Sequence, residues 1–314
     1  MVIINPGRGR KGILPLLIIL IVSQFFFSCA TMGSMGEKIP IFGKALGVFN
    51  TAIDSISKTS GVAKDAWKNA FEDITPEQEY YIGRAVAANI LSSYKIQANW
   101  PNTTAYLNRI CRALVINSPR PEIYNEYHVA VLDSDEINAF ATPGGHIFLT
   151  RALVNSATSE DTLAAVVAHE LSHIQLQHGL KAIKNARGTQ AVLSSVNIVT
   201  GTVGEVVNRP EVMAAFNDSI NDMVSTMVTR GYSQVQEFNA DSVAMSLMAL
   251  AGYEPSSLME MLMMLEKNQS GKSGGFINTH PTPAQRITNA QKTVGNYEVP
   301  DTRSYREARY KAIR

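Results

Sequence analysis

Two histidines four residues apart, with a glutamate beside the first, are the feature that most restricts the fold of this 314-residue chain. The pentapeptide 169–173, His-Glu-Leu-Ser-His, lies in a run that begins with Ser159 as a helix cap and two acidic residues. Residues four apart share one helix face, so both imidazoles can reach one Zn²⁺ while Glu170 takes a proton from a water on that ion. We expect a helix here that ends near Gly179. Two surface histidines on an unrelated helix are the alternative.

A zinc ion held by this pair needs a third protein ligand. The next histidine, His178, follows His173 by five residues and would lie off the ligand face of a continuous helix. A later acidic pair, Glu237 and Asp241, is four residues apart on a second expected helix. Glu237 can bind the metal, and Asp241 can accept a hydrogen bond from the free ring nitrogen of a ligand histidine. Taken alone, such a pair is usually a solvated helix face.

Helical and extended segments surround this motif. The sequence Thr75-Pro76-Glu77-Gln78 is typical of a capping box and predicts a helix that runs to about Tyr94. Further helices are expected at 102–116, 235–251 and 256–267, and extended segments at 127–133, 138–141 and 146–150. The last two flank a turn at 143–145. The fold class is therefore α+β, mainly helical with a small β-sheet, and 188–231 could be a loop, a helical hairpin or a lid.

The first 28 residues have the layout of a secretory signal peptide. Basic residues between Arg8 and Lys11 precede the apolar run 13–27, and small residues follow it. The run is rather short for a membrane-spanning helix, which needs about 20 apolar residues. We expect residues 1–28 to be removed and find no later run that is long and apolar enough to span.

The end of this segment resembles the lipobox of bacterial lipoproteins, in which a cysteine becomes the acylated first residue. Cys29 is the predicted lipidation site, although Phe26 occupies the usual Leu position. An incidental cysteine in an ordinary signal peptide or anchor helix is the alternative. Ala30 instead of Asp favours the outer membrane by the usual sorting pattern. The expected location is the bacterial cell envelope, lipid-anchored and facing the periplasm.

The charge balance argues against nucleic acid as a partner. The chain has 28 Lys and Arg against 27 Asp and Glu, and three of the basic residues lie in the predicted signal peptide. The mature chain would therefore carry a small negative charge, without a basic field. We expect residues 29–74 to form a tether with N-terminal helices, 75–295 the main domain and 296–314 a polar C-terminal tail.

Several short motifs taken together resemble metallopeptidase family 48, the gluzincins that include HtpX-like proteases, CaaX prenyl endopeptidases and periplasmic lipoprotein relatives. They are 169–173, Glu237 with Ala240-Asp241, Asn138-Ala139-Phe140 before Pro143-Gly144-Gly145, and Thr279-His280-Pro281 with Arg286. The resemblance spans about 75–290, and the single apolar segment is similar to that of the periplasmic lipoprotein branch. The family often has Arg where this chain has Gln177 and Gln234, so this chain lacks the charges that those arginines supply.

The resemblance implies a zinc metallopeptidase domain at 75–295, with one Zn²⁺ per chain and a role for each matching residue. The metal ligands would be His169, His173 and Glu237, with Glu170 as general base and acid and Asp241 supporting a ligand histidine. His280 would lie near the metal and either stabilise the developing oxyanion or block the open position. Arg286 would anchor the loop that carries His280.

An extended substrate would lie beside an arm of the hairpin at 138–150 and pair with its main chain. The predicted substrate-binding residues are Asn138, Ala139, Phe140, Gly144 and Gly145; plain sheet core is the alternative. Main-chain pairing suits unfolded or misassembled proteins as substrates. The expected function is a zinc-dependent endopeptidase acting on misfolded or misassembled envelope proteins. The alternative is a membrane-tethered, chaperone-like assembly or quality-control factor with gated or weak proteolysis.

Overall fold

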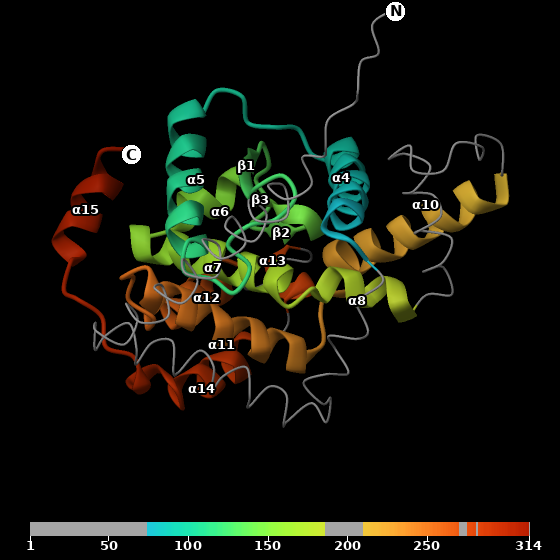
Figure 1. Ribbon diagram of the computed structural model, residues 1–314. Helices are drawn as coiled ribbons and strands as arrows, with labels where there is room; N and C mark the ends of the chain where they lie inside the picture. Colours follow the sequence, from blue (N-terminus) through green and yellow to red (C-terminus); the bar gives the residue numbers. More distant parts are fainter. Residues whose placement is uncertain (1–73, 186–209, 270–274, 281, 314) are drawn as a thin grey trace, which may run out of the picture. The chain divides into compact units, whose positions relative to one another are not determined.

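The computed structural model describes residues 74–185, 210–269, 275–280 and 282–313 (Figure 1). The predicted signal peptide, the tether and Cys29 lie outside these residues, as does the first half of the segment 188–231. Within the described part of the chain, no helix combines the length and the apolar character that a membrane crossing requires.

The described residues are mainly helical, as the sequence predicted, with a small mixed sheet. The helices are α4 (Pro76–Ser93), α5 (Pro101–Val115), α6 (Arg151–Ser156), α7 (Glu160–Gln175), α8 (His178–Asn185), α10 (Pro210–Ser225), α11 (Gln234–Leu250), α12 (Ser257–Gln269), α13 (Phe276–Thr279), α14 (Pro283–Gln291) and α15 (Arg303–Lys311), with short helical turns η1 (Pro143–Gly145), η2 (Thr226–Arg230) and η3 (Val294–Asn296). The capping box at the start of α4 is present, because the Thr75 side chain accepts from the Gln78 N–H and the Gln78 side chain accepts from the Thr75 N–H.

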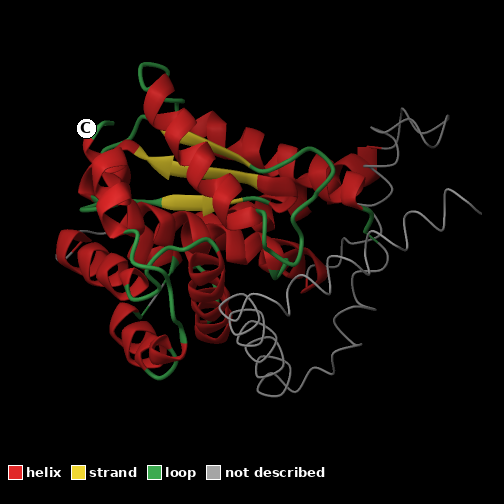
Figure 2. Cartoon of the chain, turned by 60° about the vertical axis from the view of Figure 1, so that its left-hand side comes forward, coloured by secondary structure: helices red, strands yellow, loops and turns green. Residues whose placement is uncertain are grey.

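The sheet has three strands, β1 (His128–Leu132), β2 (Ala139–Ala141) and β3 (His146–Thr150), in the order β1-β3-β2 (Figure 2). β2 and β3 pair antiparallel around η1, as the sequence predicted, and β1 pairs with β3 in parallel. Successive side chains of a strand point to opposite faces. Ile147 and Leu149 therefore join one buried apolar cluster, with α5, α7, α11 and α12, while Phe148 joins a second cluster with α4 and α10.

The two outer strands of the sheet have different neighbours. The side chain of Asn108, from α5, donates to the carbonyl of Val129 and accepts from its N–H, at 2.7 and 2.9 Å. Gln97 N–H donates to Val131 O at 2.8 Å. The Asn108 side chain and the backbone of Gln97 thus provide hydrogen-bond partners for main-chain groups on the outer edge of β1. The other edge strand is β2, which packs against α7.

Helix α7 is the central helix of the described residues. All 16 of its residues are buried, and α5, α11, α12 and α15 pack against it. Its apolar residues occupy every face, as expected of a helix that is covered on all sides. The helix ends at Gln175 instead of near Gly179, because Gln177 adopts a left-handed backbone conformation with φ of 55°.

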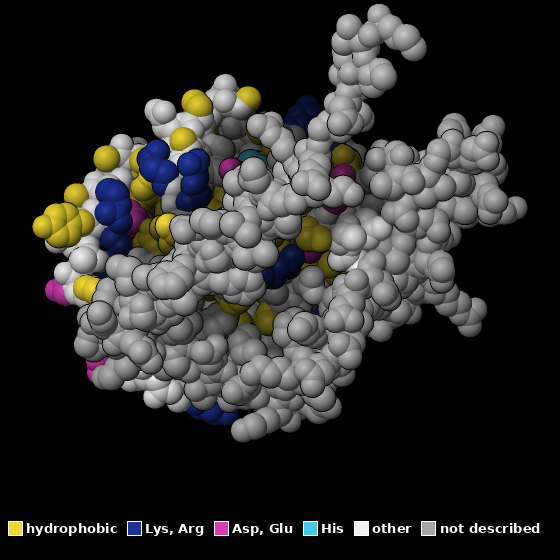
Figure 3. Space-filling model, viewed as in Figure 1, with side chains coloured by type: hydrophobic (Ala, Val, Ile, Leu, Met, Phe, Trp, Pro, Cys, Tyr) yellow, Lys and Arg dark blue, Asp and Glu magenta, His cyan; other side chains and the backbone are white. Residues whose placement is uncertain are grey.

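The segment 296–314, expected to be a polar tail, contains helix α15, which packs against α7. Arg306 is buried and donates from Nε to Asp161 Oδ2 at 2.9 Å, and Arg309 pairs with Glu160. Both acids lie in the first turn of α7. Figure 3 shows Lys and Arg side chains beside hydrophobic ones on the face that carries α5 and α15. The polar composition of α15 therefore includes arginines that neutralise buried acids on the central helix.

Close packing of α4 on η1 predicts that Gly83→Ala destabilises the fold. A Cβ atom at Gly83 would lie 1.7 Å from the carbonyl oxygen of Pro143, so one of the two backbones must shift. We expect the free energy of unfolding in urea to fall by about 1–3 kcal/mol, the usual cost of overpacking. Gly295→Ala is the control, because no atom of the described residues lies within 4 Å of a Cβ there. Equal stability of the two variants would contradict this packing.

Candidate metal centre

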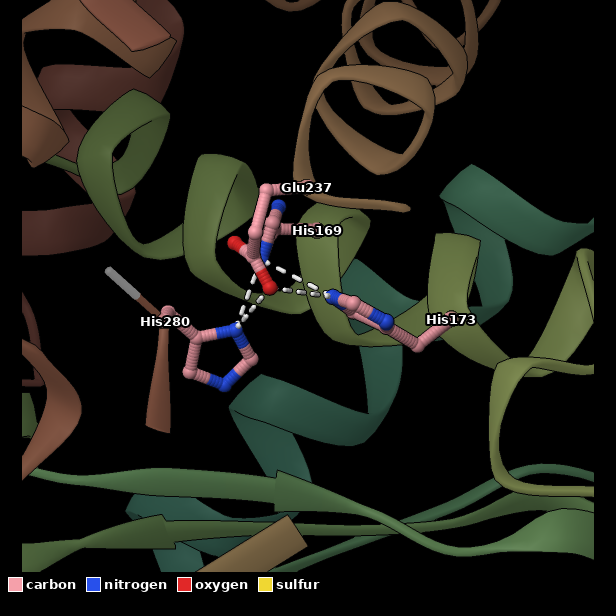
Figure 4. Close-up of side chains that lie close together, drawn as sticks. All are labelled: His169, His173, Glu237 and His280. Carbon is pink, nitrogen blue, oxygen red and sulfur yellow. Dashed lines mark hydrogen bonds and ion pairs between the residues drawn. The ribbon is translucent and has the colours of Figure 1, made fainter. Parts of the chain in front are cut away.

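Four side chains from distant parts of the sequence converge where α7, α11 and α13 meet (Figure 4). His169 and His173 come from α7, Glu237 from the first turn of α11, and His280 from the residue after α13. One nitrogen or oxygen atom from each lies within 4.8 Å of the others. All four side chains are buried, with at most 2% of each residue exposed.

The three ligands expected from the sequence have spacings that suit a small metal ion. The Nε2 atoms of His169 and His173 are 3.2 Å apart. Glu237 Oε2 lies 3.4 Å from His169 Nε2, and Glu237 Oε1 lies 3.6 Å from His173 Nε2. Tetrahedral zinc with bonds of about 2.0–2.1 Å would separate its ligand atoms by roughly 3.3 Å. The donor set, two imidazoles and a carboxylate, is also one that zinc accepts.

Asp241 contacts the expected ligand His169, and Arg286 contacts the expected ligand Glu237. His169 Nδ1 lies 3.0 Å from Asp241 Oδ1, so the ring nitrogen that faces away from the other ligands has a carboxylate partner. Arg286 is completely buried and bridges two acids, with Nη2 2.6 Å from Asp241 Oδ1 and Nη1 2.9 Å from Glu237 Oε2. Its contacts thus include Glu237, one of the three expected metal ligands.

These contacts determine the charge of the site. Burial raises the pKa of Glu237, but the charges of His280 and Arg286 outweigh it and hold that pKa well below its usual value. Burial likewise raises the pKa of Asp241, and Arg286 more than reverses this. Burial and Arg286 lower the pKa of His169, while hydrogen bonds to Asp241 and Glu237 raise it to about 9. The charged forms of both carboxylates are therefore favoured, and a metal at His169 Nε2 would require that ring to be neutral.

Glu170 lies beside the cluster without being part of it. Glu170 is 1% exposed, and its Oε1 atom has no hydrogen-bond partner within the described residues. His280 Nε2 lies 3.5 Å from that oxygen. Burial raises the pKa of Glu170. A buried carboxylate oxygen without a partner is uncommon and suits a group that exchanges a proton with a bound molecule.

His280 occupies a fourth corner of the cluster. Its N–H donates to Phe276 O at 2.7 Å, and its ring stacks on that of Phe276 with centroids 4.2 Å apart. Its Nδ1 atom lies 3.0 Å from Glu237 Oε1 and 3.2 Å from His169 Nε2. The structure therefore places His280 at the ligands, within the range where it can contact a metal held by them.

The predicted substrate-binding residues of β2 are largely enclosed. Ala139 and Phe140 are at most 1% exposed, and the Phe140 ring packs 5.4 Å from that of Tyr94. Asn138 Oδ1 accepts from the Ala139 N–H at 2.9 Å and from Thr279 Oγ1 at 3.4 Å. Side-chain contacts with a substrate are not available at Phe140 in this arrangement, and what β2 can offer is its main chain.

Gly144 and Gly145 are buried within η1 and do not line an open edge. Their φ angles are 69° and 96°, a region that favours glycine. A Cβ atom at Gly144 would lie 2.6 Å from the Cα of Tyr80, and one at Gly145 would lie 2.4 Å from Ile123. The turn conformation and the close approach of these residues account for both glycines, in place of the predicted contact with substrate.

Two residues near the cluster were missed from the sequence. His178 Nδ1 lies 2.9 Å from His173 Nδ1, and the ring of Tyr232 stacks on His173 with centroids 4.1 Å apart. A continuous helix would keep His178 off the ligand face, and no residue in the segment signals the left-handed turn at Gln177. Tyr232 directly follows the segment 188–231, for which the sequence predicts no single structure.

Comparison with known proteins agrees with this geometry. The chain is 28% identical over 195 residues to the beta-barrel assembly-enhancing protease of Escherichia coli (strain K12), covering 62% of this chain and 39% of that protein. It is 23% identical over 240 residues to the mitochondrial metalloendopeptidase OMA1 of Schizosaccharomyces pombe, covering 74% of this chain and 66% of that protein. It is 28% identical over 151 residues to the metalloprotease LoiP of E. coli K12, covering 48% of this chain and 56% of that protein.

The chain thus spans about two fifths of the length of the assembly-enhancing protease. The family model of peptidase family M48 matches residues 101–294, more than half of the chain. This match contains the whole α7 motif, Glu237 and His280, in agreement with the resemblance seen in the sequence. The chain belongs to peptidase family M48.

Proposed function

We propose that this chain is a zinc-dependent endopeptidase that hydrolyses misfolded or misassembled proteins of the bacterial cell envelope. The observation that carries the proposal is the juxtaposition of two imidazoles, one carboxylate and the buried oxygen of Glu170 on adjoining helices. The names of two bacterial relatives, an assembly-enhancing protease and a metalloprotease, support protein substrates. The first of these names also supports an envelope substrate.

His169, His173 and Glu237 would hold the zinc ion, and Asp241 with Arg286 would fix the orientation of His169 and the charge of Glu237. When bound, zinc acts as a Lewis acid on the scissile carbonyl and lowers the pKa of water to about 7. The two histidines present their Nε2 atoms toward the same point, which requires each ring to keep its proton on Nδ1.

Glu170 moves the proton in the proposed reaction. Its Oε1 atom takes a proton from the attacking water and then delivers it to the leaving amine. Burial raises the pKa of this carboxyl, so its protonated form is reached more easily than in an exposed glutamate. Because Glu170 lies between His169 and His173 on one helix, its distance from them is set by the helix itself.

An extended substrate is proposed to pair with the main chain of β2. This strand is an edge of the sheet and packs against α7. Edge pairing uses backbone groups, which every unfolded protein exposes. We propose Asn138 as the residue that orients the start of the strand, since its side chain caps the Ala139 N–H.

Lipid attachment at Cys29 would place the enzyme on a membrane facing the periplasm, with the outer membrane favoured. Such a location matches envelope proteins as substrates. Lipidation rests on the lipobox-like sequence alone, because Cys29 lies outside the described residues.

The alternative function, a tethered quality-control factor with gated proteolysis, has one specific observation in its favour. The described conformation closes the site, since Glu170 and the four clustered residues are at most 2% exposed. Phe276 N–H also donates to Ile137 O at 2.9 Å, so α13 covers the start of β2. His280 directly follows α13 in the chain. A movement of α13 would therefore open β2 to a substrate and withdraw His280 from the ligands at the same time.

Gating predicts that His280→Ala raises casein degradation. Removing the ring removes the contacts of His280 with Glu237 and Phe276, which favours the open state. If the open state is a minor population, activity rises by the reciprocal of its fraction, and we expect at least about threefold. Initial rates with excess zinc are the measurement.

Asn278→Ala is the matched control, because this side chain is exposed on the same short helix. Unchanged activity in His280→Ala would argue against gating. Lost activity would assign His280 to stabilisation of the oxyanion.

Zinc content and casein degradation, measured together on purified protein lacking residues 1–29, test the enzyme itself. About one zinc per chain with degradation supports the endopeptidase. Zinc without degradation would favour the gated factor, and protein that holds no zinc would overturn both the ligand assignment and the reaction.

A further inference from the structure

The end of α7 brings a third histidine behind the ligand His173. On a continuous helix, a residue five positions later would lie about 140° around the axis from His173. Here α7 ends at Gln175, Gln177 has φ of 55°, and α8 begins at His178. This left-handed turn redirects the chain, so that the His178 ring meets the His173 ring edge-on, with centroids 4.9 Å apart.

The contact between the two rings joins specific atoms. His173 Nε2 faces the Nε2 atom of His169 at 3.2 Å, and His173 Nδ1 faces His178 Nδ1 at 2.9 Å. A metal on Nε2 leaves the ring proton of His173 on Nδ1. Within the described residues, the hydrogen-bond contact at His173 Nδ1 is the one with His178 Nδ1. From these distances we infer that His178 is a positioning residue, which accepts a hydrogen bond from Nδ1–H of the zinc ligand His173.

The surroundings of His178 suit an acceptor. The residue is 2% exposed, and its Nδ1 atom lies within hydrogen-bond distance of His173 Nδ1. A neutral ring whose proton is on Nε2 offers a lone pair at Nδ1. The inference deepens the proposed function and rests on it, because it takes His173 to be a zinc ligand.

A neutral partner for His173 also fits the charge balance of the site. The other ligand histidine, His169, has the carboxylate of Asp241, whose charge Arg286 offsets. Glu170 and Glu237 are further buried acids nearby. A carboxylate at position 178 would add a further buried negative charge to this site. An imidazole orients the ligand without that charge.

The start of α8 is held firmly enough to fix the ring of His178. A Cβ atom built on Gly179 lies 3.3 Å from the Pro143 ring, so this residue packs directly on η1. Tyr232 stacks on His173 and lies 5.7 Å from the His178 ring. His173 is therefore oriented on its face by an aromatic ring and at its edge by His178.

Two substitutions separate hydrogen bonding from packing. His178→Asn keeps an acceptor oxygen close to the position of Nδ1 but loses volume. His178→Phe keeps the ring but has no acceptor. We expect His178→Phe to lower the zinc affinity of the full-length chain by about 10- to 100-fold, and His178→Asn to stay within a fewfold of the parent. Competition for Zn²⁺ against a chromophoric chelator measures both, with circular dichroism as the check of folding.

Equal affinity of His178→Phe and the parent would overturn the inference, and so would an equal loss in both variants, since packing would then be the cause. A parent that binds no zinc would instead overturn the proposed function. A second measurement needs no variant. In zinc-loaded parent protein labelled with ¹⁵N-histidine, one ring proton should couple to nitrogens of two histidines across the Nδ1–Nδ1 hydrogen bond. An Nδ1 proton assigned to His173 that lacks this coupling would exclude His178 as the acceptor, even if His178→Phe failed to fold.

Discussion

Glu170→Gln is expected to abolish casein degradation in a protein that still carries about one zinc per chain. An amide of the same shape cannot take a proton from water, and a positioned acid–base group contributes typically 10²–10⁴-fold to a rate. Glu170 is not among the four residues whose ligand atoms cluster, so zinc content should not change. The loss should appear in kcat, measured from initial rates beside zinc content by atomic absorption.

Loss of the fold cannot account for this expected result. Glu170 is buried and its Oε1 atom lacks a hydrogen bond within the described residues, so a neutral amide removes a buried charge. Stability in urea should therefore be equal or higher. Glu122→Gln, at an exposed position, controls for the substitution itself. Retained degradation in Glu170→Gln would place the proton transfer on another group, and loss of zinc with activity would move Glu170 into the ligand set.

The local features of this site were predictable because they depend on helix geometry. His169 and His173 share a face at a spacing of four, and the same spacing on α11 brings Glu237 toward the ligands and Asp241 toward the ring of His169. The capping box of Thr75 and Gln78 is likewise complete within four residues. Each of these relations needs only the 3.6-residue period and a side-chain type.

Relations that depend on a single backbone angle or on distant parts of the chain were not predictable. The position of His178 follows from one positive φ at Gln177, a residue with no special preference for that conformation. The composition of residues 296–314 is typical of a polar tail, and nothing in it signals the buried acids of α7 that Arg306 and Arg309 neutralise. The parallel pairing of β1 with β3 is also a long-range choice.

The glycines of η1 illustrate how one pattern fits two causes. Gly144 and Gly145 suggest either an accessible turn that binds a ligand or a turn under close packing. Only the three-dimensional contacts with Tyr80 and Ile123 decide for packing. The glycine pair itself predicts a turn with positive φ angles. The residues that pack against this turn lie elsewhere in the chain, and the glycine pair does not identify them.

Arg286→Met is expected to lower the free energy of unfolding by about 3–5 kcal/mol, the usual cost of removing one partner from a buried ion pair. Arg286 is fully buried and donates to Asp241 from Nε at 2.8 Å and from Nη2 at 2.6 Å, besides its contact with Glu237. Methionine replaces the volume but leaves two buried carboxylates without a cation. Urea unfolding with a chelator present is the measurement, because a bound metal would itself offset Glu237.

The pH dependence of this loss separates charge from packing. Burial raises the pKa of Asp241, but Arg286 lowers it by more, so the pKa in the folded parent is below that in the unfolded chain. Asp241 therefore stabilises the fold above its unfolded pKa, and this stabilisation is lost as the pH falls through the folded pKa. Without the arginine, both carboxylates become easier to protonate, and protonation removes the unpaired charge. The difference in free energy of unfolding between the parent and Arg286→Met should therefore be largest near neutral pH and become smaller toward about pH 4. Arg230→Met, at an exposed pair with Asp222, should cost no more than about 1 kcal/mol at any pH. A gap for Arg286→Met that stays constant with pH would assign the effect to packing and remove Arg286 from the electrostatic support of the ligands.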